Sequence, residues 1–371
     1  MSRKKILLAC FEVPGWGGAS TSAYKLFQML QADGLQIVLV NIIGEDDVAY
    51  FQHLFGEDIG NPRGLKGVFN CFLQGNNYRH QVNLHNLIES IDPDLVIGIG
   101  LTAVYILKMA DPRRKLIYLT TGCGWMKGYL KWHPKGDFLS FAQRLLNHPE
   151  RIAGGNEMER KAVQMADLVV THSDITLQLH KAIYPSSAAK LYSKVVWFSE
   201  WIYEDALEYA QRRKDFVDRQ NDVLFIANDW GRPEKNYRLV KKIIARLKDL
   251  AVHIVGEVRE KLPGVTYHNF VGNRAALFTL MSDSKVVASA SSFDASPGIL
   301  FEGSAMGCNV ITSKNCGNWQ LCNMRLLVEP VSVAGFVDCI HRATSLKFED
   351  NIDMFHEKKS YDDFKDLLKN Y

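Results

Sequence analysis

Several features that would define other classes of protein are missing from this chain of 371 residues. No uninterrupted apolar stretch approaches the roughly 18 residues that a membrane-spanning helix needs. The apolar run after the basic start ends early, at Glu12 and Pro14, so it fits a buried strand better than a signal peptide. An excess of one charge is also missing, because 44 Lys and Arg oppose 41 Asp and Glu, and a net charge of +3 argues against a duplex nucleic-acid surface. We therefore expect a cytoplasmic protein that binds no nucleic acid.

The cysteine motifs of metal sites and the glycine motif of dinucleotide-binding domains are also missing. The seven cysteines are scattered from Cys10 to Cys339 without a Cys-x-x-Cys pair or a matching histidine spacing. This pattern indicates neither a zinc site nor a disulfide framework, and it favours buried reduced thiols. The glycine-rich turn at 14–21 lacks the Gly-x-Gly-x-x-Gly spacing, which counts against a simple nicotinamide-dependent dehydrogenase.

What the chain does contain is an alternation of short apolar runs and amphipathic stretches of helix length. This pattern is typical of parallel sheets covered by crossover helices, and the length exceeds a single hydrophobic core, so we expect two α/β domains. A charge-rich segment at 199–220 separates them, which predicts domains at 1–198 and 199–354. The helical periodicity at 355–371 predicts a terminal helix that can pack back on either domain, the first being the one we name. Strands are expected at 5–11, 36–42, 95–99, 115–119, 167–171 and 194–198, then at 222–227, 251–255, 266–270, 285–288 and 309–312, with helices including 21–32, 156–166 and 174–183.

The segment after the expected strand 285–288 contains the largest number of candidate ligand-binding residues. Ser296 or a neighbour is expected to cap a helix, with Pro297 in its first turn and Gly298 open to close approach. Free amides at such a helix end favour a phosphate. Asp294 in the loop and Glu302 in the helix would both face a ligand held there, and carboxylates accept hydrogen bonds from sugar hydroxyls. The alternative is a helix-capping aspartate and a solvated glutamate.

A resemblance to a known family enters at these residues. A carboxylate, seven residues and a glutamate, followed by Ala-Met-Gly and an apolar strand, resemble the retaining glycosyltransferase family 4, or glycosyl transferases group 1. Family members usually have Glu where this chain has Asp294, whose reach is one methylene shorter. The loop at 312–318 also looks like the family's small-residue loop after this strand.

A third match lies at 228–236, where the family has an arginine and a lysine for the donor diphosphate. Lys235 stands at the lysine position, but the arginine position holds Trp230, and Arg232 would supply that charge from two residues later. A departing nucleoside diphosphate develops negative charge that fixed cations and amides stabilise. The alternative is a solvated cation pair at a helix start.

The acceptor half has fewer signals. Many relatives have a histidine after the strand that here is 115–119, whereas this chain continues Thr-Thr-Gly-Cys-Gly, so we assign no catalytic histidine. His133 comes later, and His172 is best interpreted as structural. The aromatic and basic segment 125–135 fits three roles, namely stacking on a sugar, peripheral contact with lipid headgroups at the inner face of a membrane, or packing under a loop.

The resemblance implies an α/β GT-B fold, with two Rossmann-like domains facing across a cleft and the donor bound mainly by the C-terminal one. In that scheme Lys235, Arg232 and the amides around Gly298 hold the diphosphate, Asp294 holds the transferred sugar and Glu302 holds the ribose. The full set of residues predicted to bind the donor is Gly17, Gly18, Arg232, Lys235, Gly272, Asp294, Gly298, Ile299, Leu300 and Glu302.

The predicted activity is the retaining transfer of a hexose-type sugar from a UDP-sugar or GDP-sugar to a glycan, a lipid-linked acceptor or a small molecule. The acceptor attacks on the face that the diphosphate leaves, so no protein nucleophile is required. Asp92-Pro93-Asp94 and Glu45-Asp46-Asp47 resemble metal-binding Asp-x-Asp only superficially, and we expect no essential metal or other cofactor. The alternatives are a GT-B sugar-nucleotide epimerase and a catalytically degenerate partner protein that binds a sugar nucleotide.

Overall fold

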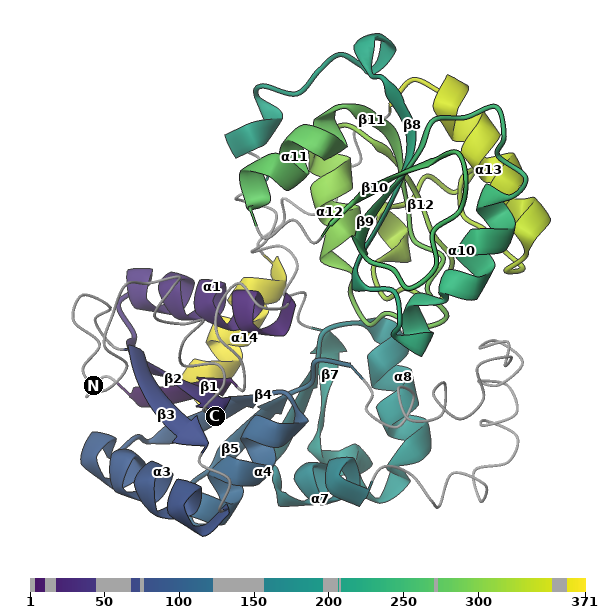
Figure 1. Cartoon of the computed structure of the whole chain (residues 1–371). Helices are drawn as coiled ribbons and strands as arrows, with labels where there is room; N and C mark the ends of the chain where they lie inside the picture. Colours follow the sequence, from purple (N-terminus) through teal and green to yellow (C-terminus); the bar gives the residue numbers. More distant parts are fainter. Residues whose placement is uncertain are drawn as a thin grey trace. The chain divides into compact units, whose positions relative to one another are not determined.

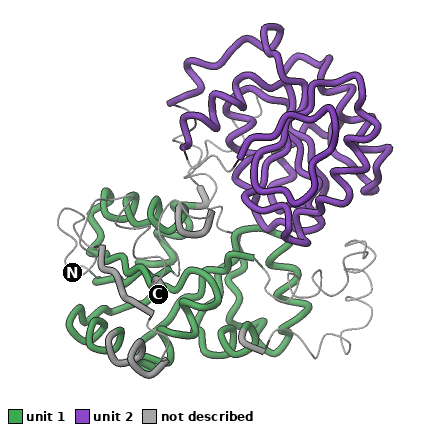
Figure 2. Tube along the Cα trace, in the orientation of Figure 1, with its two compact units in different colours: residues 1–124, 150–198, 360–371 green, residues 125–149, 199–359 purple. Residues whose placement is uncertain are grey.

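The computed structural model describes residues 4–10, 18–44, 68–73, 77–122, 157–195, 206, 208–269, 273–348 and 359–371. The chain forms two compact units, drawn in green and purple in Figure 2. Unit 1 comprises Met1–Gly124, Glu150–Phe198 and Ser360–Tyr371, and unit 2 comprises Trp125–Pro149 and Ser199–Lys359. Each unit is an α/β domain with its own parallel sheet.

The sheet of unit 1 has seven parallel strands in the order β3-β2-β1-β4-β5-β6-β7. Its strands are β1 (Lys5–Cys10), β2 (Gln36–Gly44), β3 (Val68–Leu73), β4 (Leu95–Ile99), β5 (Leu116–Leu119), β6 (Leu168–Thr171) and β7 (Leu191–Val195). The strand order reverses between β1 and β4. In doubly wound sheets, ligands bind at the carboxyl ends of the strands at such a switch point. The central strands are buried on both faces, as their continuous apolar sequences predict.

Helices cover both faces of this sheet (Figure 1). They are α1 (Gly18–Ala32), α3 (Asn77–Ile91), α4 (Leu101–Ala110), α7 (Glu157–Met165), α8 (Asp174–Ile183) and the C-terminal α14 (Lys359–Asn370). The helices α3, α4 and α7 pack side by side over one apolar cluster that includes Leu7, Val96 and Val104. The terminal helix α14 packs on unit 1, where Phe364 and Leu368 are fully buried.

Two strands of unit 1 differ from the sequence prediction. The strand expected at 194–198 is observed at Leu191–Val195, because a half-polar edge strand does not stand out from the more apolar run that follows it. Strand β3 was not predicted, since its sequence Val-Phe-Asn-Cys-Phe-Leu carries a polar residue inside a short run.

The sheet of unit 2 has five parallel strands in the order β10-β9-β8-β11-β12. Its strands are β8 (Asn221–Asp229), β9 (Val252–Glu257), β10 (Val265–His268), β11 (Ser284–Ala288) and β12 (Asn309–Ile311). Helices α10 (Tyr237–Ile244) and α13 (Val333–Ser345) cover one face, and α11 (Arg274–Ser282) and α12 (Gly298–Ala305) cover the other (Figure 1). The strand expected at 266–270 ends at His268, two residues early. Within the described residues, no helix combines the length and apolar character needed to cross a membrane.

Candidate functional site

The candidate site lies where the neighbouring strands β8 and β11 end in unit 2. Lys235 follows β8 at the end of a short 3₁₀ helix, η4 (Pro233–Lys235), and Asp294 follows β11. Because carboxyl ends of parallel strands meet at one edge of a sheet, the two side chains come together, and the Lys235 ammonium donates a hydrogen bond to the Asp294 carboxylate. Both side chains are less than one-fifth exposed, at 19% and 16%. A lysine can bind an anionic group of a ligand, and a carboxylate can accept hydrogen bonds from its hydroxyls, so this edge is the candidate site.

Backbone hydrogen bonds fix the loop that carries Lys235. The amide of Lys235 donates to the carbonyl of Arg232 at 3.0 Å, and Asn236 adopts a left-handed conformation with φ of 55° that starts α10. The carbonyl of Glu234 accepts from the amide of Ser292 at 2.8 Å, which ties this loop to the one that carries Asp294. The position of Lys235 is therefore set by main-chain geometry.

The two positions expected to supply a second cation have other partners. Trp230 is 6% exposed, packs in the apolar core of unit 2 and donates its indole N–H to the carbonyl of Val255 at 2.9 Å. The Arg232 guanidinium bonds to the carboxylate of Glu234, with Nε to Oε1 at 2.9 Å. The structure thus brings Lys235 and Asp294 together, whereas Arg232 forms an ion pair with Glu234.

The loop predicted from its small residues holds Asp294 from the other side. The amide of Asp294 donates to the carbonyl of Asn315 at 3.1 Å, and the amide of Gly317 donates to the carbonyl of Asp294 at 2.9 Å. These bonds form an isolated parallel bridge between Asp294 and Cys316. The aspartate is held on a short strand-like segment rather than on a free loop.

Helix α12 begins one residue later than predicted. Pro297, the neighbour of Ser296, occupies the N-cap position, so the expectation that Pro297 lies in the first turn was wrong. The side-chain amide of Asn318 donates to the carbonyl of Pro297 at 2.9 Å and fixes the helix start. Pro297 itself offers no side-chain acceptor to the amides of the first turn.

The backbone amides at the start of α12 divide into two groups. Those of Gly298 and Ile299 have no hydrogen-bond acceptor among the described residues, as expected for the first turn of a helix. The amide of Leu300 instead donates to the carbonyl of Pro297 at 3.1 Å, so this amide already has an acceptor within the chain. Two amides therefore remain for a phosphate.

Glu302 lies in the second turn of α12 and is almost buried, with 7% of its side chain exposed. Its Oε1 lies 3.1 Å from Nη1 of Arg274, the first residue of α11. Sequence reasoning missed Arg274. A signal was present in Asn273, a strong helix N-cap residue, which places Arg274 at a helix start on the ligand-binding side of the sheet.

Several predicted residues do not enter this site. Gly17, Gly272, His133 and the segment 125–135 lie outside the described residues, as does Glu45-Asp46-Asp47. Gly18 is the first residue of α1. His172 is buried after the end of β6, in keeping with a structural interpretation.

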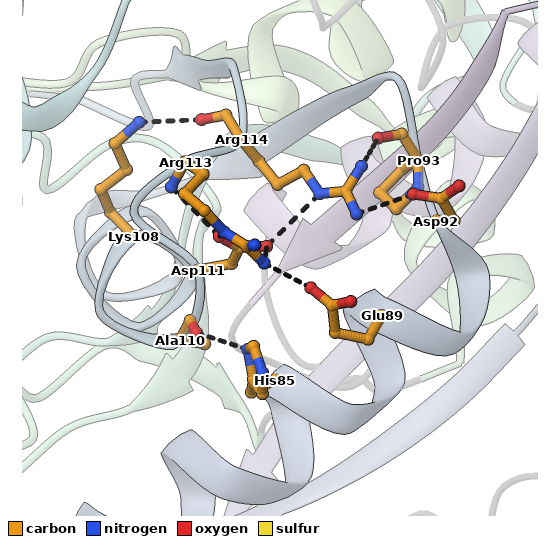
Figure 3. Close-up of polar contacts among 9 residues, drawn as sticks. All are labelled: His85, Glu89, Asp92, Pro93, Lys108, Ala110, Asp111, Arg113 and Arg114. Atoms are coloured by element: carbon orange, nitrogen blue, oxygen red, sulfur yellow. Dashed lines mark hydrogen bonds and ion pairs between the residues drawn. The ribbon is translucent and has the colours of Figure 1, made fainter.

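Asp92 and Pro93 belong to a network of hydrogen bonds and ion pairs in unit 1 (Figure 3). Asp92 accepts from Arg114 Nη2 at 2.7 Å, and the carbonyl of Pro93 accepts from Arg114 Nη1 at 2.9 Å. Asp94 accepts from the amide of Lys5 at 2.7 Å. These contacts give both carboxylates a structural role.

The same network contains the one group of three possible metal ligands among the described residues, namely His85, Glu89 and Asp111. Asp111 accepts from Arg113 Nε at 3.1 Å and from Arg114 Nε at 3.3 Å. Burial raises the pKa of Asp111, but the hydrogen bonds from Arg113 and Arg114 outweigh it and hold the pKa below its ordinary value. Two guanidinium groups on the central carboxylate disfavour a cation there.

Five cysteines are free and buried, as the sequence predicts, namely Cys10, Cys308, Cys316, Cys322 and Cys339. Burial raises the pKa of Cys308 to about 11 and that of Cys322 to about 12. These thiols remain protonated at neutral pH, so they are structural residues rather than nucleophiles.

Comparison with known proteins agrees with this geometry. Residues 220–345 match the family model described as Glycosyl transferases group 1. Curated proteins give no match. Among solved structures, HepE from Anabaena, in complex with UDP-glucose, is similar with a TM-score of 0.66, 14% identity and coverage of 99% of this chain and 100% of that one.

Two other structures show the same likeness. The lipopolysaccharide outer core galactosyltransferase WaaB has a TM-score of 0.64, 14% identity and 99% coverage of both chains. The UDP-GlcNAc 2-epimerase from Methanocaldococcus jannaschii has a TM-score of 0.58, 12% identity and coverage of 99% and 100%. The chain thus has the GT-B fold, and its segment 220–345, which carries Lys235, Asp294 and Glu302, matches the model of the glycosyl transferases group 1.

Proposed function

We propose that this protein is a glycosyltransferase that takes a hexose-type sugar from a UDP-sugar or a GDP-sugar. The observation that carries the proposal is the ion pair between Lys235 and Asp294, which lies on the loop that leads into α12, in the segment that matches the transferase family. HepE, whose structure holds UDP-glucose, supports a nucleotide-sugar donor.

Each side chain has a defined part in the proposed reaction. When the donor binds, Lys235 releases Asp294 and forms an ion pair with the diphosphate. Other oxygens of the diphosphate accept hydrogen bonds from the amides of Gly298 and Ile299. The freed Asp294 carboxylate accepts hydrogen bonds from hydroxyls of the transferred sugar. Glu302 accepts hydrogen bonds from the ribose.

The half-exposed Arg232 supplies additional positive charge to the leaving diphosphate after it releases Glu234. Charge stabilisation by these cations and amides takes the place of a divalent metal. We also propose that the anomeric configuration is retained, with the leaving phosphate as the base for the acceptor hydroxyl. The acceptor is a glycan, a lipid-linked saccharide or a small molecule.

A transfer assay tests this function. Purified protein is incubated with radiolabelled UDP-hexoses and GDP-hexoses and with pools of glycan, lipid-linked and small-molecule acceptors, and incorporated label is measured. We expect transfer from one donor class by the wild type and loss of transfer in Lys235→Ala and Glu302→Ala. Lys241→Ala is the matched control, because Lys241 forms an ion pair with Glu260 on the outside of α10. Tight donor binding without transfer to any acceptor pool would contradict the proposal and favour a partner protein.

The similarity to a UDP-GlcNAc 2-epimerase supports a second candidate activity. An epimerase would convert one free UDP-N-acetylhexosamine into its C2 epimer without any acceptor. Proton NMR of the nucleotide sugar incubated with the protein alone distinguishes the two activities. Appearance of the epimer would replace the transferase proposal.

A further inference from the structure

The ion pair between Arg274 and Glu302 joins two elements of unit 2. Arg274 starts α11 and Glu302 lies in the second turn of α12, and the two helices are in contact on the same face of the sheet (Figure 1). The atoms Nη1 of Arg274 and Oε1 of Glu302 are 3.1 Å apart. This ion pair therefore connects α12 to α11, two helices that are separate in the sequence.

The two partners differ in exposure. The Glu302 side chain is 7% exposed, so its negative charge needs a fixed partner to remain in this position. The Arg274 side chain is 36% exposed. Removing the arginine would leave a nearly buried carboxylate without this ion pair.

The arginine is itself held in place at the helix start. Its neighbour Asn273 caps α11 by accepting from the amides of Ala275 and Ala276, at 2.9 and 3.4 Å. The Arg274 guanidinium lies over the ring of Phe278, with its Cζ 5.0 Å from the ring centroid. The cap fixes the backbone at the helix start that carries Arg274, and the Phe278 ring covers one side of the guanidinium that contacts Glu302.

We propose that Arg274 is a positioning residue for nucleotide recognition, which orients Glu302 so that its carboxylate selects a donor with an intact ribose diol. A carboxylate offers about four lone-pair sites, so it can accept from Arg274 and also from two vicinal hydroxyls. The ligand class is a ribonucleoside diphosphate rather than a deoxyribonucleoside diphosphate. This inference rests on the proposed function, because it takes the donor to lie over α12.

Affinity for matched nucleotides tests the role of Arg274. Isothermal titration calorimetry measures the Kd of UDP and GDP and of their 2′,3′-dideoxy analogues for the wild type, Arg274→Ala, Arg274→Lys and Lys241→Ala. We expect the wild type to bind the better ribonucleotide about 10- to 100-fold more tightly than its dideoxy analogue, since two hydrogen bonds to a charged group are lost. In Arg274→Ala this ratio should fall to within about 3-fold of unity, because the Glu302 carboxylate has lost the ion pair with Arg274 that sets its orientation.

The variants separate positioning from general stability. Arg274→Lys keeps the charge but not the planar fork, so its ratio should lie between the other two, and Lys241→Ala should keep the wild-type ratio. If Arg274→Ala does not fold, as judged by circular dichroism, the result for Arg274→Lys decides, and an unchanged ratio there contradicts the proposal.

The possible failures are distinguishable. An equal loss of affinity for the ribo and dideoxy forms would mean that Arg274 contacts the phosphate or the base directly, which contradicts its role through Glu302. Absence of binding of either nucleoside diphosphate to the wild type would overturn the proposed function, and this inference with it.

Discussion

At the scale of single residues, Lys235 and Arg232 differ in how the fold holds them. Lys235 is mostly buried against Asp294, whereas the Arg232 side chain is 43% exposed and pairs with its near neighbour Glu234. We predict that Lys235→Ala lowers kcat/KM for transfer by about 100-fold, because a fixed cation at the leaving diphosphate is lost. Arg232→Ala should lower it less, by about 10-fold or below. Steady-state kinetics with the active donor measures both, and an equal or reversed order of the two effects would contradict the assigned roles.

Trp230 gives a second prediction at this scale. The family resemblance predicted an arginine at this position, yet here the indole is buried and bonded to Val255. Trp230→Arg should therefore reduce the free energy of unfolding by about 3–5 kcal/mol, through lost packing and an unpaired buried charge, and should not raise activity. Urea unfolding monitored by circular dichroism checks the first part. A variant of wild-type stability with increased transfer would show that the position belongs to the donor site.

The motif spacing predicted Lys235, Asp294 and Glu302 because strand, loop and helix boundaries in the sequence fix where these side chains emerge. Arg274 was not predicted, since its partner is chosen by contact between two helices and no local pattern reports that contact. The pairing of Arg232 with Glu234 was missed for a different reason. A charged side chain at a loop has several acceptors within reach, and sequence alone does not rank them.

At the scale of elements, strand β9 ends against β8 through a glycine that no other residue can replace. Gly256 has φ of 112°, and a Cβ there would lie 1.6 Å from the carbonyl oxygen of Ala227. Gly264 also has a positive φ, 74°, but a Cβ there would meet nothing within 4 Å. A comparison of substitutions at these two glycines therefore distinguishes the cost of backbone strain from the cost of a steric clash.

We predict that Gly264→Ala lowers the free energy of unfolding by about 1–2 kcal/mol, the strain of a left-handed alanine. Gly256→Ala should lower it by well over about 3 kcal/mol, because β8 and β9 must also separate at that point. Chemical unfolding of the two variants measures the difference. Similar values for both would mean that the strands relax easily there.

Most strands of unit 2 were predictable because each is a short apolar run buried on both faces of a parallel sheet. Strands β3 and β7 lie at the two edges of the unit 1 sheet, where one side has no neighbouring strand and polar residues are tolerated. Their sequences consequently lack the continuous apolar signal on which the prediction depended. The start of α12 was misplaced because its stabilising contact comes from Asn318, which is distant in sequence.

At the scale of the whole molecule, the alternating pattern and the length predicted two α/β units, and the resemblance in the C-terminal half predicted the GT-B fold. What the pattern did not predict is how the buried polar groups of unit 1 are paired. His180 in α8 is fully buried, with Nε2 4.0 Å from Oε1 of Glu159 and 3.4 Å from the carbonyl of Gly122. Burial lowers the pKa of His180 below its ordinary value of 6.5, although Glu159 and the Gly122 carbonyl oppose the shift.

This lowered pKa predicts a pH dependence of unit 1. The folded state keeps His180 neutral, so its contribution is fully present above about pH 6.5 and is lost as the pH falls below that value, because the unfolded chain binds the proton first. The loss reaches about 1.4 kcal/mol per pH unit at most. Hydrogen exchange of α8 peptides between pH 8 and pH 5, corrected for the intrinsic rate, measures it. His180→Gln should reduce this slope, and an identical slope in the variant would contradict the assignment.

The central claim is that unit 2 binds a nucleotide-sugar donor over the start of α12. A crystal structure of the protein with the tighter-binding of UDP and GDP tests it most directly. The account predicts the diphosphate within hydrogen-bond distance of Lys235 Nζ and the amides of Gly298 and Ile299, with the ribose at Glu302. A nucleotide bound elsewhere, or one whose phosphates leave the ion pair between Lys235 and Asp294 intact, would contradict it.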